Sequence, residues 1–172
     1  MTRRVLAGLI GANIQKWLSP ALFEDACAAA GIRGRYHLLD MDRDAERSLD
    51  DLLETARSTG FAGVNITYPC KEAVLPLLDA VSDEASQIGA VNTVSIAADG
   101  KTTGYNTDRI GFQRAFAETF GPSAARGQSA VLVGAGGAGR AIAFALFDLG
   151  LQTLFVNDKS SDQARARVAR LS

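Results

Sequence analysis

The sequence predicts an α/β fold in two parts. Short apolar runs typical of buried strands alternate with amphipathic helical segments in the N-terminal part. A strand, a glycine-rich turn, a helix and a second strand ending in an acid follow one another over residues 131–158. We therefore expect an α/β domain over residues 1–106, a linking helix and joint over 107–127, and the start of a Rossmann-like dinucleotide-binding domain over 128–172. We expect that last domain to be truncated, because only two of its usual six or so strands are recognisable.

The elements of the N-terminal part follow from hydrophobic periodicity and turn residues. The expected strands are Arg4–Ile10, Arg35–Leu39 and Phe61–Thr67, with a hairpin of Ala90–Ala97 and Thr102–Tyr105 around Asp99-Gly100. The expected helices are Pro20–Ala30, Asp44–Ser58 and a third from Thr107 or Asp108 to about Phe120.

The first helix illustrates the reasoning used for helix starts and buried faces. Ser19 before Pro20 fits an N-cap followed by a proline at the first helical position. The apolar side of that helix should be buried, and it comprises Leu22, Phe23, Ala26 and Cys27.

The composition is that of an ordinary globular protein and excludes several functional classes. The formal net charge of −1 over 172 residues gives no electrostatic footprint for nucleic acid or an anionic membrane. Two cysteines make no disulfide framework, and a single histidine argues against a histidine-based metal site. No apolar run reaches the roughly 18 residues of a membrane span. We expect a cytoplasmic monomer or homodimer without a metal, a nucleic-acid partner or a membrane partner.

The glycine cluster after Ala130–Val133 is arranged as a dinucleotide fingerprint requires. Gly134 allows a tight turn, Gly136 lets the backbone approach a pyrophosphate, and Gly139 lets helix and strand pack closely. The free N–H groups at the start of the helix then face the phosphates. The candidate cofactor-binding residues are Gly134, Ala135, Gly136, Gly137, Ala138, Gly139, Asn157, Asp158 and Lys159.

Asp158 bears on the choice between NAD and NADP. It lies nineteen positions after Gly139, where a carboxylate accepts hydrogen bonds from the adenosine ribose hydroxyls and repels a 2′-phosphate. This favours NAD as the cofactor. Lys159 could instead hold a phosphate, which keeps NADP as the alternative.

Polar side chains stand where the predicted strands end and helices begin. Asn65 and Thr67 close a strand, Lys71 follows in the next turn, Asn92 interrupts an apolar strand, and Asp108 begins a helix. Such positions face the ligand crevice of α/β domains, and a lysine converging with an aspartate could exchange the proton of a substrate hydroxyl. Each also has a structural alternative, because Asn92 could satisfy a neighbouring backbone, Asp108 could be an N-cap, and Lys71 could be a solvated surface charge.

Four ordered motifs together resemble the shikimate dehydrogenase family. They are NITYPCK (Asn65–Lys71), GAVNT (Gly89–Thr93), GYNTD (Gly104–Asp108) and GAGGAGRA (Gly134–Ala141). The resemblance runs from about Leu9 to the last residue. It implies an N-terminal substrate domain, a C-terminal nucleotide domain and the reduction of 3-dehydroshikimate to shikimate, a step of aromatic amino acid biosynthesis, with a nicotinamide cofactor.

The resemblance also implies roles for the polar residues already identified. Lys71 would be the catalytic acid/base, and Asp108 the catalytic aspartate that orients it. The implied substrate-binding residues are Ser19, Asn65, Thr67 and Asn92. NADP-using members usually carry arginine where this chain has Asp158, which agrees with NAD.

One segment departs from the family pattern and keeps alternative functions open. The family usually carries S-x-S-P here to grip the substrate carboxylate, whereas this chain has Trp17-Leu18-Ser19-Pro20, and an indole cannot accept a hydrogen bond. A quinate or aminoshikimate dehydrogenase is therefore an alternative, and so is a truncated, non-catalytic ligand-binding module. The three motifs upstream of the glycine loop argue against an unrelated nicotinamide enzyme.

Overall fold

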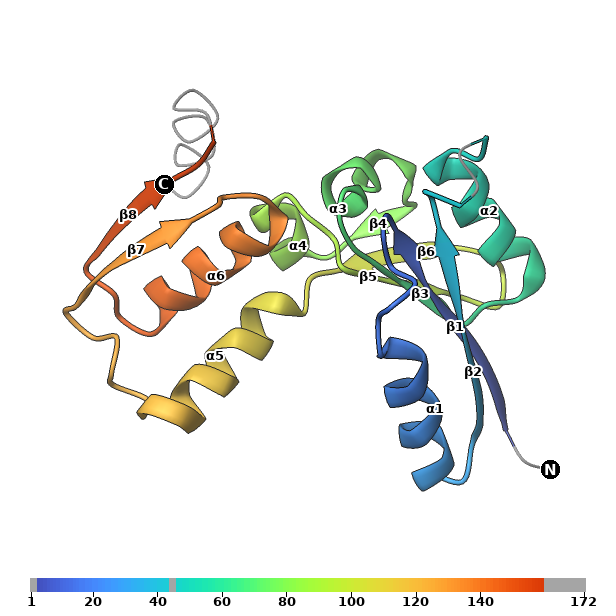
Figure 1. The fold of residues 1–172 in the computed structure, drawn as a ribbon, viewed down its shortest axis with the longest axis horizontal. Helices are drawn as coiled ribbons and strands as arrows, with labels where there is room; N and C mark the ends of the chain where they lie inside the picture. The colour runs from blue at the N-terminus through green and yellow to red at the C-terminus, as the bar shows by residue number, and fades with distance from the viewer. Residues whose placement is uncertain (1–2, 44–45, 160–172) are drawn as a thin grey trace. The chain divides into compact units, whose positions relative to one another are not determined.

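The computed structural model describes residues 3–43 and 46–159, which form two compact units (Figure 1). Unit 1 comprises the residues up to Ser82 together with Val91–Tyr105. Unit 2 comprises Asp83–Ala90 together with the residues from Asn106 onward. The α/β class is as predicted. The expected domain boundaries remain a proposal, and the two units differ from them in that Asp83–Ala90 packs with unit 2.

Unit 1 is built on a mixed six-stranded sheet with the strand order β2-β1-β3-β5-β6-β4. Its strands are β1 (Arg4–Gly11), β2 (Arg33–Asp40), β3 (Gly63–Ile66), β4 (Ala80–Val81), β5 (Thr93–Ile96) and β6 (Thr102–Tyr105). β1 pairs in parallel with β2 and β3, while β5 is antiparallel to both β3 and β6. The predicted hairpin is thus β5–β6, and Gly100 in its turn has φ +83°, a left-handed conformation that favours glycine.

Two helices cover the sheet of unit 1 on opposite faces (Figure 1). α1 (Ser19–Ala29) connects β1 to β2, and α2 (Leu49–Thr59) connects β2 to β3. The two connections cross the sheet in opposite directions, and right-handed crossovers therefore place the helices on opposite faces. Central strand β1 is consequently buried along its second half.

α2 begins later than the sequence predicts. Residues 46–48 are not helical, and the expected start at 44–45 lies outside the described residues. A capping box sets the start: Asp51 N donates to Ser48 Oγ at 3.1 Å, and Ser48 N donates to Asp51 Oδ2 at 2.9 Å. This pair satisfies two N–H groups that would otherwise lack partners.

α1 corrects two expectations. Its N-cap is Leu18 rather than Ser19, which is the first helical residue; the Ser19 side chain instead acts on Tyr36 of β2, whose pKa it lowers. The buried face is also narrower than predicted, because Leu22 is 70% exposed and Ala26 is exposed as well.

Only Phe23 and Cys27 of the expected four residues of α1 pack inward, and Gly34 of β2 explains why. A Cβ atom at Gly34 would lie 2.6 Å from Cys27 Sγ and 3.0 Å from the Phe23 ring. The helix therefore approaches β2 closely along this line, which turns the neighbouring positions toward solvent.

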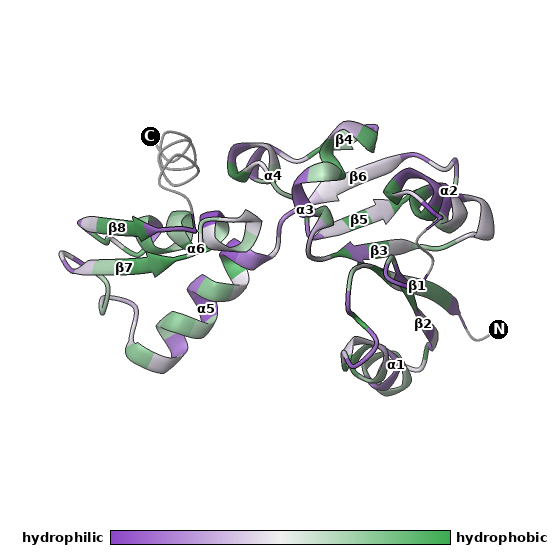
Figure 2. Cartoon of the chain, turned by 45° about the horizontal axis from the view of Figure 1, so that its top comes forward, coloured by the Kyte–Doolittle hydropathy of each residue, from purple (hydrophilic) through white to green (hydrophobic). Residues whose placement is uncertain are grey.

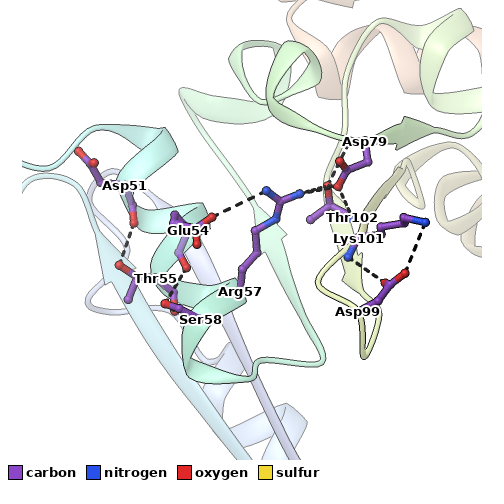
Figure 3. A network of polar contacts seen from close by, with 9 residues as sticks. All are labelled: Asp51, Glu54, Thr55, Arg57, Ser58, Asp79, Asp99, Lys101 and Thr102. Atoms are coloured by element: carbon purple, nitrogen blue, oxygen red, sulfur yellow. Dashed lines mark hydrogen bonds and ion pairs between the residues drawn. The ribbon is translucent and has the colours of Figure 1, made fainter.

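The chain between β3 and β5 contains short elements that the sequence did not indicate. They are α3 (Cys70–Ala73), the 3-10 turn η1 (Leu75–Leu77), β4 and α4 (Asp83–Ile88). In unit 1 this region is tied to α2 by Arg57, which contacts Asp79 and donates to Thr102 Oγ1 at 3.2 Å (Figure 3). Asp79 Oδ2 in turn accepts from the N–H and the hydroxyl of Thr102, both at 2.8 Å.

The described part of unit 2, up to residue 159, contains α4, two longer helices and a pair of parallel strands. These are α5 (Asp108–Phe120), β7 (Ser129–Val133), α6 (Gly137–Asp148) and β8 (Thr153–Asn157). The predicted order of strand, glycine turn, helix and strand is therefore present, with α6 beginning three residues before the expected Arg140. Ile88 of α4, Ala90 just after it, and Ala141 and Phe144 of α6 form a core cluster. Within residues 3–43 and 46–159, no helix is long and apolar enough to span a bilayer.

Candidate functional site

Two of the predicted motifs lie side by side in unit 1. Ile66 N donates to Asn92 O at 2.8 Å, and Val91 N donates to Lys71 O at 2.8 Å. These bonds hold the end of β3 and the turn after it against the segment that enters β5. The structure thereby brings together Asn65, Thr67, Lys71 and Asn92.

Side-chain hydrogen bonds join the two asparagines of this cluster. Asn65 Nδ2 donates to Thr93 Oγ1 at 3.1 Å and to Asn92 O at 3.4 Å. The Thr93 hydroxyl donates to Asn92 Oδ1 at 3.0 Å. Asn65 Oδ1 accepts from the hydroxyl of Tyr36 at 2.7 Å. Sequence reasoning missed Tyr36, because nothing in a strand pattern signals a partner 29 positions away.

Lys71 sits in the first turn of α3, directly after a buried anchor. Cys70 is 2% exposed, its N–H donates to Thr67 O at 2.8 Å, and its Sγ lies 3.1 Å from Met41 Sδ. Burial raises the pKa of the Cys70 thiol, so the thiol stays protonated and unreactive at neutral pH. Cys70 is therefore a packing residue, and its place in the core fixes where Lys71 leaves the backbone.

The loop between β1 and α1 is organised by Asp40 at the end of β2. Burial raises the pKa of the Asp40 carboxyl, but hydrogen bonds outweigh burial and hold that pKa below its ordinary value. The donors are the Gln15 side chain, at 2.8 Å, and the backbone N–H groups of Asp42, Ile14 and Asn13. Asp40 thus shapes the loop that precedes Trp17 and Ser19, and the Trp17 side chain at its end is about half exposed.

Asp108 lies in unit 2 as the first residue of α5. Its N–H donates to Asn106 Oδ1 at 3.0 Å, and Asn106 Nδ2 donates to Ala90 O at 2.9 Å. Thr107, the N-cap residue by position, makes no capping bond with its side chain. Asn106 therefore takes the capping role that the sequence assigned to Thr107 or Asp108. Lys71 belongs to unit 1, so its pairing with Asp108 remains a proposal.

The glycine loop of unit 2 contains two positions that require glycine and one with open space around it. Gly134 has φ +89°, and a Cβ atom at Gly139 would lie 2.1 Å from Gly134 O, so both positions need glycine. A Cβ atom at Gly136, the N-cap of α6, would meet nothing within 4 Å. The open space at Gly136 together with the N–H groups that begin α6 fits a phosphate group.

Asp158 lies against this loop. Its Oδ2 accepts from Ala135 N at 3.0 Å, and its Oδ1 accepts from Lys159 N at 2.7 Å. Both carboxylate oxygens accept a backbone N–H, and these bonds orient the group. Asn157 contributes its backbone, since its carbonyl accepts from Gly134 N at 2.8 Å. The acid is therefore held against the glycine loop at the end of β8.

Arg140 is a second residue that sequence reasoning missed. It is 1% exposed, and it donates from Nε to Ile88 O at 2.7 Å and from Nη2 to Gly89 O at 2.9 Å. A cation on the last carbonyls of a helix is favourable, so Arg140 ties the end of α4 to the first turns of α6. The available signal was a lone arginine within the otherwise apolar run after the glycines.

Two hollows in the described residues lie away from these groups. One, of about 380 Å³, adjoins Arg57 and Asp79, and one, of about 1020 Å³, lies along β1, α1 and β2. No predicted site residue lines either hollow. The candidate site is therefore placed at the hydrogen-bonded residues around Asn65 and Asn92. Among residues 3–43 and 46–159, no three His, Cys, Asp or Glu residues are grouped to hold a metal ion.

Comparison with known proteins identifies the family. Residues 9–94 match the model of the shikimate dehydrogenase substrate binding domain. A quinate/shikimate dehydrogenase (NAD(+)) of Corynebacterium efficiens is 48% identical over 94% of this chain, and a shikimate dehydrogenase (NADP(+)) of Streptomyces avermitilis is 43% identical over 97%. The chain spans 57% of the length of each of these relatives.

The fold agrees with the sequence comparison. The structure of quinate dehydrogenase from Corynebacterium glutamicum in complex with NAD superposes with a TM-score of 0.91 at 44% identity, covering 99% of this chain and 60% of that one. The similarity therefore includes both units and the glycine loop. Because such identity extends over nearly all of its residues, the chain belongs to the shikimate and quinate dehydrogenase family.

Proposed function

We propose that this chain supplies the substrate site, the catalytic pair and the pyrophosphate loop of an NAD-dependent dehydrogenase. The substrate is a shikimate-like cyclic hydroxy acid, and the reaction is reversible hydride transfer at its 3-position alcohol, converting 3-dehydroshikimate to shikimate. The observation that carries the proposal is the backbone pairing of the Lys71 and Asn92 segments, which gathers an amine, a hydroxyl and two amides in unit 1. Such groups suit the hydroxyls of a polar ring.

Lys71 is the proposed acid/base at the reacting oxygen. An ammonium donates a proton to the oxygen as the carbonyl is reduced, and the amine takes it back in the reverse direction. Asp108 is the proposed partner that orients this amine. Ser19, Asn65, Thr67 and Asn92 are the proposed ring-binding residues.

The nicotinamide cofactor would be held by the glycine loop and by Asp158, and it supplies the hydride when it is bound. NAD is favoured because the Asp158 carboxylate, held against Ala135 N, would repel a 2′-phosphate. The relative from Corynebacterium efficiens is named for NAD(+), and the one from Streptomyces avermitilis for NADP(+). Lys159 beside Asp158 keeps NADP as the alternative.

Substitution of Lys71 tests the proposal. Lys71→Ala should lower kcat for shikimate oxidation by roughly 10²- to 10⁴-fold while changing KM only modestly, because the lost group acts on the proton rather than on binding. The measurement is the absorbance of the reduced cofactor formed by the purified protein. Lys101→Ala, which removes a lysine with an exposed side chain at the β5–β6 turn, is the matched control and should retain the wild-type rate. An unchanged kcat in Lys71→Ala would remove the lysine from the mechanism.

Quinate is the second candidate substrate, favoured by the Trp17 segment and by the quinate-named relatives. Trp17 is the single tryptophan and is about half exposed, so its fluorescence can report ligands bound near Ser19. A titration with shikimate and with quinate should change this fluorescence at saturable concentrations. Binding without turnover would favour the alternative of a non-catalytic ligand-binding module. A response to neither compound would contradict both substrate assignments.

A further inference from the structure

Four side chains of unit 1 form an ordered hydrogen-bond series. It begins at Tyr36 on β2, passes over β1 to Asn65 on β3, and continues through Thr93 to Asn92 beside β5. The donor-to-acceptor distances are 2.7 Å from the Tyr36 hydroxyl to Asn65 Oδ1, 3.1 Å from Asn65 Nδ2 to Thr93 Oγ1, and 3.0 Å from Thr93 Oγ1 to Asn92 Oδ1. The Ser19 side chain also acts on the Tyr36 hydroxyl, whose pKa it lowers. The series therefore joins two of the four residues assigned to the substrate, Asn65 and Asn92, and its first member has no assigned role.

Tyr36 is held rigidly at the head of this series. Its side chain belongs to the core cluster with Ala7, Leu9 and Ile14, and its ring centroid lies 5.3 Å from that of Phe23. The residue is 8% exposed. Packing on these neighbours leaves the ring little freedom, so the hydroxyl occupies one position between α1 and β3.

The Tyr36 hydroxyl is the donor in its hydrogen bond to Asn65. Burial raises the pKa of Tyr36 to about 12, although the hydrogen bond with Ser19 lowers it. The group is thus a neutral donor at any physiological pH and is unsuited to acid–base chemistry. Donation to Asn65 Oδ1 fixes the orientation of that amide, because an amide oxygen cannot donate. Asn65 Nδ2 must then point to Thr93, whose hydroxyl donates in turn to Asn92 Oδ1.

We propose that Tyr36 is a positioning residue that determines specificity: through this series its hydroxyl sets which hydrogen-bonding atoms Asn65 and Asn92 present to the ring hydroxyls of the ligand. The inference rests on the proposed function, in which these asparagines bind the ring. A ring of different hydroxyl pattern requires a different arrangement of donors and acceptors. Quinate and shikimate differ in this way, since quinate has a saturated ring with one more hydroxyl.

Tyr36→Phe is the direct test, because it keeps the packed ring and removes only the hydroxyl. The affinities for shikimate and for quinate, measured by calorimetric titration, should fall by unequal factors, with the larger loss roughly tenfold. In turnover the loss should appear in KM rather than in kcat. Tyr105→Phe, which removes a hydroxyl from a half-exposed tyrosine of β6, is the matched control and should alter neither affinity.

The side-chain amide signals of Asn65 and Asn92 in nitrogen-15 NMR spectra provide a readout that needs no ligand. They can be assigned by their loss in Asn65→Ala and Asn92→Ala. Tyr36→Phe should shift both signals, and Tyr105→Phe should shift neither. If Tyr36 acts through Asn65, adding Tyr36→Phe to Asn65→Ala should cause no further change in the ratio of the two affinities.

The outcomes separate this inference from the proposed function. If the wild-type protein binds neither ligand, the proposed function fails, and the amide signals alone decide whether Tyr36 orders the asparagines. Unmoved signals, or equal losses for both ligands, would overturn the positioning role. If Tyr36→Phe does not fold, Thr93→Val decides, because it cuts the series between the two asparagines. In Thr93→Val, a shifted Asn92 amide signal and an altered ratio of the two affinities would support the inference. If the signal and the ratio are both unchanged, the inference is overturned.

Discussion

The two units differ in how much of their own apolar surface they cover. In unit 1 both faces of the sheet carry a helix, and Leu9, Ile10 and Val94 are almost completely buried. In unit 2 the outer residues of the two strands are bare: Val131 is 70%, Val133 79% and Phe155 60% exposed. Figure 2 shows the hydrophobic colouring along β7 and β8. Unit 1 thus has a complete core, whereas the sheet of unit 2 has an apolar face that no other described residue covers.

This difference explains where each unit can hold precise geometry. A parallel sheet is normally covered on both faces, and buried residues are locked by packing. The side chains of Asn65 and Tyr36 therefore stand on a rigid base. The glycine loop takes its shape from local backbone constraints instead, above all from the contact of Gly139 with Gly134.

The largest effect is expected in the core of unit 1. Leu53→Ala should lower the free energy of unfolding by about 2–5 kcal/mol, because Leu53 is 1% exposed and its truncation leaves a cavity beneath α2. Urea unfolding followed by circular dichroism measures the loss. Leu22→Ala makes the same change on the exposed side of α1 and should cost under about 0.5 kcal/mol. Equal losses in the two variants would contradict the assignment of these faces.

The next effect concerns the glycine loop of unit 2. Gly139→Ala should destabilise this unit by about 1–3 kcal/mol, because its Cβ atom would collide with a backbone oxygen rather than with a movable side chain. Gly136→Ala is the matched control, since it meets open space and should preserve the fold. The same methyl group should nevertheless weaken the binding of NAD, if the pyrophosphate lies over Gly136. Thermal unfolding and NAD titration of both variants measure these effects.

A smaller effect is expected from pH in the loop before α1. The pKa of Asp40 is lower in the folded protein than its ordinary value. The ionised Asp40 therefore contributes its full stabilisation at pH values above the ordinary carboxyl pKa, and this stabilisation is lost as the pH falls through the depressed pKa. Asp40→Asn should cost about 1 kcal/mol at neutral pH through weaker hydrogen bonds. The variant should also lose less stability than the wild type on acidification.

Asp25→Asn is the matched control for this prediction, because Asp25 is an exposed carboxylate of unit 1. Its unfolding free energy should follow that of the wild type from neutral to acidic pH. Identical acid sensitivity in Asp40→Asn and Asp25→Asn would show that the bonds from the loop do not depend on the charge of Asp40.

The parts of the fold that the sequence predicted are those with local signals. Strand alternation, the Asp99-Gly100 turn and the glycine loop each depend on residues that are close in the chain. The elements α3, η1 and α4 were missed because three to six residues are too few to show helical periodicity. The exposure of Leu22 was missed because it depends on the close approach of α1 to Gly34, a residue of another element.

The same distinction applies to the candidate site. The motif residues were proposed from their places in the predicted elements: Asn65 near a strand end, Lys71 in the turn after it, and Asn92 as a polar residue within an apolar strand. Tyr36 and Arg140 could not, because their hydrogen-bond partners lie 29 and 52 positions away, respectively. Residues that bind a ligand tend to lie in short motifs, whereas residues that orient them can come from any strand that packs nearby.

The smallest expected effect sharpens the comparison between the two sheets. Val133→Thr replaces a methyl group by a hydroxyl at nearly constant volume on the bare face of β7. In the 172-residue chain it should change the free energy of unfolding by under about 0.5 kcal/mol, because both side chains remain in water. Val94→Thr makes the same change at a fully buried position of β5 and should cost about 1–3 kcal/mol.

The two valines can then be compared in the protein isolated from its natural host, whose intact mass is measured alongside. If Val133→Thr remains almost neutral there, the face of β7 is exposed in the working protein, and unit 2 is stable with one covered face. If the cost of Val133→Thr rises toward that of Val94→Thr, further polypeptide covers this face of β7. Either the intact mass should then exceed that of these 172 residues, or the protein should form an oligomer. The effect of one hydroxyl group at position 133 thus shows whether the β7 face that is exposed in the 172-residue chain is also exposed in the natural protein.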